Sequence, residues 1–328
     1  MTRLPINFGC WDYDRMVPIL DGRVQPDGID LNFLNMPVEE TFFRMLRHRE
    51  FEASEMSLSS YVVSLHRPEP PFVAIPVFPS RFFRHSSIYV NADSGIERPE
   101  DLVGKRVGCP EYQMTAPVWI RGILQDEYGV AVNSVRYFTG GEEAPNREEK
   151  LKLSLPEDIE VTPIGPDKTL AAMLRDGEID ALYTARKPST YDGQRVRRLF
   201  EDFPAAERDY YRRTGIFPIM HTVAVRRDVY EANRWVCQSL LKALTEAKDI
   251  AMHGLSETAA IKSMLPWTVA HFEEATALMG EDFWPYGFAP NRTALDTFLR
   301  YSHEQGLSPR RLAAEEIFAS ETLESFVI

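Results

Sequence analysis

The sequence predicts an α/β protein of two lobes. Segments with strand-like and helix-like hydrophobic patterns alternate from the start of the chain, which is typical of sheets covered by helices. The chain has 328 residues, more than one compact core usually holds, so we expect two lobes. Hydrophobic residues make up 44% and charged residues 26% of the chain, which is ordinary for a globular protein.

Short apolar runs bounded by turn residues predict the strands. In the run 29–34 apolar and polar residues alternate, as expected for a strand with one face against a core. The strands expected, in chain order, are 6–10, 29–34, 51–56, 72–77, 86–90, 105–109, 179–184 and 221–225.

Helices are expected where apolar residues recur at helical spacing and capping residues mark the ends. Pro37 suits a first helical turn, and Ser57 and Thr115 are expected N-caps. The polar stretch 137–160 is expected to be a long loop that holds at most one hairpin. The helices expected are 37–48, 57–65, 116–128, 169–175 and 231–253, with a helical turn at 98–102 and further helices from 256 onward, interrupted by the aromatic run 283–286.

Charge and cysteine usage exclude several classes of protein. The net charge of −12 argues against a nucleic-acid partner, which would need a basic surface. The N-terminus has no apolar run typical of a secretory signal, and no window of the sequence is apolar enough to span a membrane. Cys10, Cys109 and Cys237 are scattered and odd in number, so they form neither a disulfide framework nor a zinc pattern. We therefore expect a cytoplasmic protein.

The segment 78–87 combines two arginines and a histidine with three aromatic side chains. The planar fork of Arg81 or Arg84 suits a carboxylate, and His85 is a side chain that exchanges a proton near neutral pH. This composition favours an aromatic acid held beside a proton donor. The alternative is a pair of surface ion pairs and a structural histidine. If residues 80–86 are extended, Arg81 and His85 share one face and Arg84 points away.

Five short blocks occur in order along the chain: 10–15 (CWDYDR), 55–60 (EMSLSS), 76–81 (PVFPSR), 83–86 (FRHS) and 115–122 (TAPVWIRG). On these blocks the chain resembles the 4,5-dihydroxyphthalate decarboxylase family. The likeness runs from about residue 8 to residue 227 and continues more weakly to the C-terminus. It implies the two-lobed fold of type 2 periplasmic binding proteins, used in a cytoplasmic enzyme, with the ligand in a cleft between the lobes.

In that fold the chain crosses between the lobes twice. The expected crossing segments are 86–91 and 221–225. Lobe one would then consist of residues 1–86 and 227–328, and lobe two of residues 87–226.

The resemblance implies the non-oxidative decarboxylation of a hydroxylated aromatic dicarboxylate, such as 4,5-dihydroxyphthalate, which gives protocatechuate. Removing CO2 without a cofactor requires protonation of the ring carbon that carries the carboxylate. The site therefore needs a carboxylate clamp, a general acid and a base for the phenol. We expect no cofactor, and a divalent metal held by His, carboxylate and catechol oxygens stays open.

The candidate site residues form a proton-transfer group and a substrate-binding group. His85 and His221 lie on the expected crossing segments, and the acids Asp12 and Glu55 lie at strand ends, so these four are the candidate catalytic residues. Arginines, helix N-termini and aromatic rings would bind the acid. Ion pairing, capping and core packing are the structural alternatives for each. The expected substrate-binding residues are Arg81, Arg84, Ser57, Thr115, Arg121, Arg186, Trp11 and Tyr112.

Two other functions stay open at this stage. The first is a non-catalytic solute-binding protein for an aromatic or other small organic acid, of the ABC-transporter receptor type, against which the absent export signal argues. The second is another cytoplasmic enzyme of this fold, such as those of menaquinone or thiamine-precursor synthesis. The scattered cysteines argue against the cysteine-rich thiamine-precursor type. A small aromatic acid is the expected partner, nucleic acid and membrane are not, and a homo-oligomer stays open.

Overall fold

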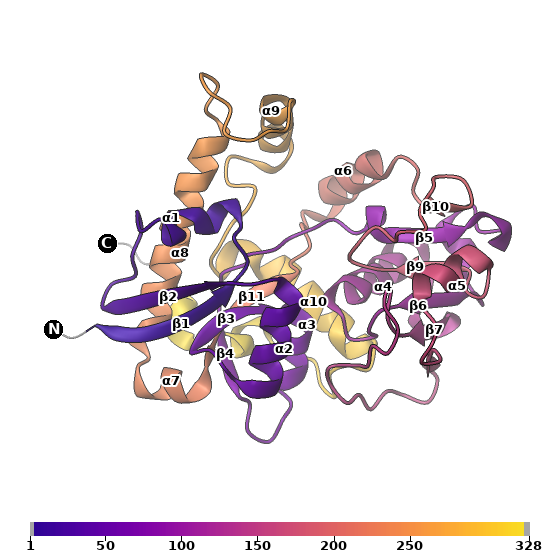
Figure 1. Cartoon of the computed structure of the whole chain (residues 1–328), viewed down its shortest axis with the longest axis horizontal. Coiled ribbons are helices and arrows are strands. Elements are labelled where there is room, and N and C mark those ends of the chain that lie inside the picture. The colour runs from indigo at the N-terminus through magenta and orange to yellow at the C-terminus, as the bar shows by residue number, and fades with distance from the viewer. Residues whose placement is uncertain (1–2, 325–328) are drawn as a thin grey trace. The chain divides into compact units, whose positions relative to one another are not determined.

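The computed structural model describes residues 3–324, and the chain divides into two compact units (Figure 1). Both units are discontinuous in sequence. They differ from the expected lobes in two ways. The chain passes from unit 1 to unit 2 after Arg81 and returns after Pro218, and a second segment of unit 2, Asp296–Leu312, lies near the C-terminus. Unit 1 consists of Met1–Arg81, Ile219–Leu295 and Ala313–Ile328, and unit 2 of Phe82–Pro218 and Asp296–Leu312.

Unit 1 contains a five-stranded sheet of order β2-β1-β3-β11-β4. β1 (Leu4–Cys10) pairs in parallel with β2 (Ile29–Asn35) and with β3 (Ala53–Ser57). β11 (His221–Arg226) runs antiparallel between β3 and β4 (Phe72–Ile75). The carboxyl ends of β1, β2 and β3 therefore lie at the same sheet edge as the first residue of β11. This edge carries the candidate site described below.

The helices of unit 1 follow the predicted capping signals closely. Pro37 is the N-cap of α2, and Ser57 accepts a hydrogen bond from the Ser60 amide at 3.4 Å at the start of α3. The long helix expected over 231–253 is instead two helices that meet at Asn233. The helices are α1 (Val17–Leu20), α2 (Val38–His48), α3 (Leu58–Ser64), α7 (Arg227–Ala232), α8 (Trp235–Leu255) and α9 (Thr268–Met279).

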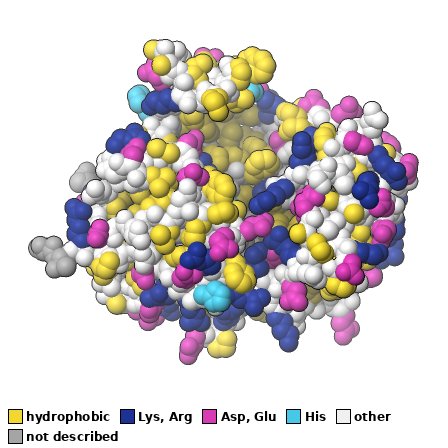
Figure 2. Space-filling view, viewed as in Figure 1, with side chains coloured by type: hydrophobic (Ala, Val, Ile, Leu, Met, Phe, Trp, Pro, Cys, Tyr) yellow, Lys and Arg dark blue, Asp and Glu magenta, His cyan; other side chains and the backbone are white. Residues whose placement is uncertain are grey.

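The segment between α8 and α9 exposes four large hydrophobic side chains: Ile261, Met264, Leu265 and Trp267. Hydrophobic side chains are visible at the top of Figure 2. Charged side chains of both signs are interspersed over the rest of the face in view (Figure 2). Within residues 3–324, no helix has the length and apolar character needed to cross a membrane.

Unit 2 contains a six-stranded sheet of order β10-β5-β9-β6-β7-β8. Its strands are β5 (Ile88–Asn91), β6 (Arg106–Cys109), β7 (Arg136–Thr139), β8 (Val161–Pro163), β9 (Ala181–Tyr183) and β10 (Val196–Arg198). β9, β6, β7 and β8 are parallel neighbours, and β5 runs antiparallel to β9 and β10. β7 and β8 pair in parallel across the loop 140–160, so a hairpin there is wrong.

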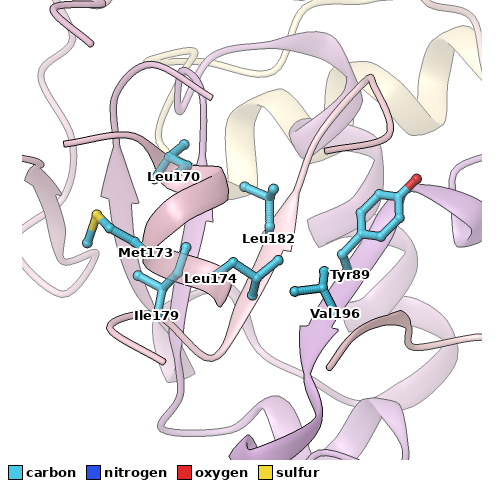
Figure 3. Packing of buried hydrophobic residues seen from close by; sticks show 7 residues of the cluster. All are labelled: Tyr89, Leu170, Met173, Leu174, Ile179, Leu182 and Val196. Atoms are coloured by element: carbon cyan, nitrogen blue, oxygen red, sulfur yellow. The ribbon is translucent and has the colours of Figure 1, made fainter. Parts of the chain in front are cut away.

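The core of unit 2 forms where α5 (Leu170–Asp176) packs on the sheet. Figure 3 shows its buried side chains: Tyr89, Leu170, Met173, Leu174, Ile179, Leu182 and Val196. Thr169 caps α5, with its hydroxyl accepting from the Ala172 amide at 3.4 Å. Neither α6 (Phe203–Thr214) nor the short, arginine-rich β10 was predicted from the sequence.

Segment 296–312 joins unit 2 by packing against α4 (Thr115–Tyr128). It begins within α10 (Arg292–Glu304), whose Phe298 ring lies 5.5 Å from the Trp119 ring. A Cβ at Gly122 would come within 2.2 Å of the Tyr301 ring, so only glycine allows this close approach. The expected N-cap Thr115 is wrong, because Met114 holds that position and Thr115 is already helical.

Candidate active site

A buried carboxylate and an imidazole meet at the edge of the unit 1 sheet where β3 ends and β11 begins. Glu55 Oε1 lies 2.6 Å from His221 Nδ1. Ser57 is opposite His221 in the antiparallel register, so Glu55, two residues earlier, faces the same side of the sheet as His221. The Glu55 side chain is fully buried, whereas that of His221 is 16% exposed. The imidazole is therefore the member of the pair that a ligand can reach.

Three groups from the end of β1 and the turn after it complete the shell around Glu55. The Tyr13 hydroxyl donates to Oε1 at 2.6 Å. The Trp11 amide and the Cys10 thiol donate to Oε2 at 3.3 and 3.6 Å. Because an ionised carboxylate only accepts hydrogen bonds, this set of donors suits Glu55 as an anion.

The electrostatics of the site keep Glu55 charged and keep Cys10 and Tyr13 neutral. Burial alone would raise the pKa of Glu55, but the charge of His221 and the hydrogen bonds from His221 and Tyr13 outweigh it and lower the pKa. Burial and the Glu55 charge raise the pKa values of Cys10 and Tyr13. His221 Nδ1–H thus donates to the carboxylate, and Nε2 is the ring nitrogen left for a ligand.

Arg15 adds positive charge beside this shell. Its guanidinium lies 4.1 Å from the centre of the Tyr13 ring and 4.4 Å from that of Trp284. Its Nε donates to the Pro79 carbonyl at 2.6 Å, and 14% of the side chain is exposed. Arg15 was not among the predicted site residues, although it is the last residue of the family-like block 10–15.

The other predicted site residues of unit 1 lie outside the Glu55–His221 pair. Ser57 caps α3, and Asp12 is exposed. Trp11 reaches Glu55 only through its amide, since 39% of the residue is exposed. Arg81 is 5% exposed, and its Nη2 donates to the Pro285 carbonyl at 2.8 Å and to Asn291 Oδ1. These contacts tie Arg81 to the segment 285–291.

Arg84 and His85 belong to unit 2. Residues 80–86 do not form one extended run, because His85–Ser87 is a single 3₁₀ turn, so the alternation that would put Arg81 and His85 on one face does not apply. His85 is 1% exposed and lies 5.1 Å from the Phe200 ring and 5.3 Å from the Tyr210 ring. Burial and the nearby charge of Arg213 lower the pKa of His85 to about 4. His85 is therefore a neutral interior side chain at pH 7, and we leave it out of the proposed site.

Four further predicted residues also lie in unit 2: Tyr112, Thr115, Arg121 and Arg186. Arg121 and Tyr112 are in direct contact. Arg121 donates from Nη2 to the Tyr112 carbonyl at 2.7 Å, with its guanidinium 3.9 Å from the Tyr112 ring. Its Nε donates to Gln305 Oε1 at 2.7 Å. Thr115 is buried in the first turn of α4, and Arg186 is exposed. Arg84 is buried near its own neighbour Ser87, whose hydroxyl accepts from Nη1 at 3.4 Å.

Within residues 3–324, no cluster of three or more His, Cys, Asp and Glu side chains is arranged to bind a metal ion.

The fold is that of the two-lobed solute-binding proteins. The chain is similar to the periplasmic aliphatic sulphonate binding protein of Escherichia coli, with a TM-score of 0.53, 14% identity, and coverage of 98% of this chain and 99% of that one. At this identity the likeness concerns the fold alone. No family model matches the chain.

The chain belongs to the 4,5-dihydroxyphthalate decarboxylase family. It is 45% identical over 330 residues to the 4,5-dihydroxyphthalate decarboxylase of Comamonas testosteroni, with all of both chains covered. It is 44% identical over 214 residues to the 4,5-dihydroxyphthalate decarboxylase of Pseudomonas putida, covering 65% of this chain and 83% of that protein. These relatives confirm the family expected from the five sequence blocks.

Proposed function

We propose that this chain catalyses the non-oxidative decarboxylation of a hydroxylated aromatic dicarboxylate, with 4,5-dihydroxyphthalate as substrate. The relative that matches the chain over its full length carries the name of that activity. The structural observation that supports it is the contact between Glu55 and His221, because it provides a proton-carrying imidazole held by a fixed carboxylate.

The reaction replaces one ring carboxylate by a proton. The hydroxyl para to that carboxylate pushes electron density into the ring, and a ring π pair forms the new C–H bond with a proton from the protein. The bond between the ring and the carboxylate then breaks, its electron pair restores the aromatic ring, and CO2 leaves. One proton is consumed for each CO2 released.

His221 is the proposed proton donor, and Glu55 is its positioning partner. Protonated His221 gives the Nε2 proton to the ring carbon while its Nδ1–H stays bonded to the carboxylate. The negative charge of Glu55 stabilises the imidazolium before the transfer. Tyr13 and the Trp11 amide hold the carboxylate in place. The Arg15 charge favours the carboxylate that remains on the product.

The test is incubation of the protein with 4,5-dihydroxyphthalate, with protocatechuate and CO2 measured. We expect His221→Asn and Glu55→Gln each to lower kcat about 10²-fold or more, because general acid catalysis typically contributes 10²- to 10⁴-fold. Glutamine keeps the shape of Glu55 but has no charge to stabilise the imidazolium.

His271→Asn is a matched control, since that histidine is 58% exposed and remote in sequence from β3 and β11. Wild-type kcat in His221→Asn would contradict the proposed donor. Tight binding of 4,5-dihydroxyphthalate by the wild-type protein without any turnover would contradict the proposed reaction and support a binding protein instead.

A further inference from the structure

Tyr286 presents a buried hydroxyl that the described part of the chain leaves without a hydrogen-bond partner. The residue is 7% exposed, and its Oη has no partner among residues 3–324. Leaving a buried hydroxyl unsatisfied costs free energy, so such a group in a well-packed interior calls for an explanation. The mechanism above does not use Tyr286.

The backbone around Tyr286 is held on both sides. The Pro285 carbonyl accepts from Arg81 Nη2 at 2.8 Å. The Gly287 amide donates to the Pro76 carbonyl at 2.8 Å, and its carbonyl accepts from Asn291 Nδ2 at 2.8 Å. These bonds hold the backbone on both sides of the tyrosine.

The surroundings connect Tyr286 with the Glu55–His221 pair. Trp284, two residues earlier, lies against the Arg15 guanidinium, which also covers the ring of Tyr13, the hydrogen-bond donor to Glu55. Burial raises the pKa of Tyr286, and the charges of Arg15 and Glu55 act on it with opposite signs. The Tyr286 phenol thus keeps its proton and can donate a hydrogen bond.

We propose that the Tyr286 hydroxyl donates a hydrogen bond to an anionic oxygen of the aromatic acid bound at the Glu55–His221 pair. A bound anion would satisfy the hydroxyl. The Arg15 guanidinium, which lies against Trp284 and pairs with Asp14 at 2.9 Å, adds positive charge on this side of the site. The anionic oxygen belongs either to a ring carboxylate or to an ionised catechol hydroxyl. The identity of the acid rests on the proposed function, but the binding role does not require turnover.

The test is the affinity of Tyr286→Phe for two unreactive probes, measured by calorimetry. Phthalate carries the carboxylates without hydroxyls, and catechol carries the hydroxyls without carboxylates. We expect the Kd of one probe to rise about tenfold or more, because that is the effect of losing a hydrogen bond to a charged group. A rise for phthalate assigns the partner as a carboxylate, and a rise for catechol assigns it as a phenolic oxygen.

Tyr210→Phe is the matched control. Tyr210 is 1% exposed, its hydroxyl also lacks a partner among the described residues, and it lies in unit 2 beside His85. Both changes remove an unsatisfied buried hydroxyl, so neither should lower the melting temperature, but only Tyr286→Phe should lose affinity.

An unchanged Kd for both probes in Tyr286→Phe would overturn the inference, as would a wild-type protein that binds neither probe. A wild-type protein that binds a probe through Tyr286 but does not decarboxylate 4,5-dihydroxyphthalate would leave this inference standing and overturn the proposed function alone.

Discussion

Two histidines of this chain have opposite surroundings, and these decide what each imidazole can do. His221 is partly exposed, and its Nδ1 lies 2.6 Å from a carboxylate oxygen of the buried Glu55. His85 is enclosed by aromatic rings, and neither of its ring nitrogens has a hydrogen-bond partner within the described residues. A proton on His85 would be buried without a counter-charge, which is unfavourable. His221 is therefore the histidine that we propose for proton transfer.

His85→Phe tests this assignment through stability. The pKa of His85 is about 4 in the folded protein, below its ordinary value of 6.5. Between these values the unfolded chain binds more protons, so wild-type stability falls as the pH falls below 6.5. We expect the variant to lose about 2 kcal/mol less than wild type between pH 7 and pH 5, in urea unfolding. Its kcat at pH 7 should stay within about twofold of wild type.

His271→Asn serves as the reference for this experiment, because the side chain of that histidine is 58% exposed. A fall in kcat of His85→Phe by more than about tenfold would return His85 to the proton-transfer group.

At the scale of elements, the loop 140–160 behaves unlike the solvated loop that its polar sequence suggests. Glu142 accepts a hydrogen bond from the Thr184 hydroxyl, and Glu149 accepts one from the Tyr112 amide. Burial raises the pKa of each of these two glutamates to about 7, above the ordinary 4.5. The loop is thus held to unit 2 by acids that resist ionisation.

Glu142→Gln and Glu149→Gln should each flatten the pH dependence of stability. Between pH 4.5 and 7 the folded protein binds more protons than the unfolded chain, so wild-type stability falls as the pH rises. For one such group the loss between pH 5 and pH 7 is about 2 kcal/mol. Urea unfolding at the two pH values measures it, and each variant should show a smaller loss than wild type.

Glu148→Gln provides the comparison within the same loop, since Glu148 is exposed. The same loss of stability from pH 5 to pH 7 in wild type and both buried-site variants would show that these carboxyls ionise normally.

At the scale of the whole molecule, each unit is assembled from segments far apart in the sequence. Unit 1 requires three segments, and unit 2 requires Asp296–Leu312 to complete the surroundings of α4. Arg121 Nε, for example, donates a hydrogen bond to Gln305, 184 positions later. The proposed reaction also concerns the whole molecule, because a protein with a net charge of −12 must attract an anion through local arginines.

Removal of divalent metal is the prediction at this scale. Because the proposed proton transfer uses His221 and Glu55 alone, turnover of 4,5-dihydroxyphthalate should be unchanged after treatment with EDTA and gel filtration. The measurement is protocatechuate formed per minute, with metal content determined on the same sample. Activity that is lost with EDTA and restored by one divalent ion would contradict decarboxylation without a metal.

Local patterns in the sequence were enough to predict the α/β class, the position of most helices and strands, and the family, because hydrophobic periodicity, capping residues and family blocks are local properties. Glu55 and His221 were predicted as separate candidates. Their pairing depends on the folded chain, since they are 166 positions apart and meet through the antiparallel register of β3 and β11. The surroundings of Arg81 and His85 also depend on the folded chain, although both residues lie in the segment 78–87. Arg81 binds the Pro285 carbonyl, and His85 packs against Tyr210. Burial and partners from distant segments decide whether such a polar side chain is available for chemistry or is used in packing.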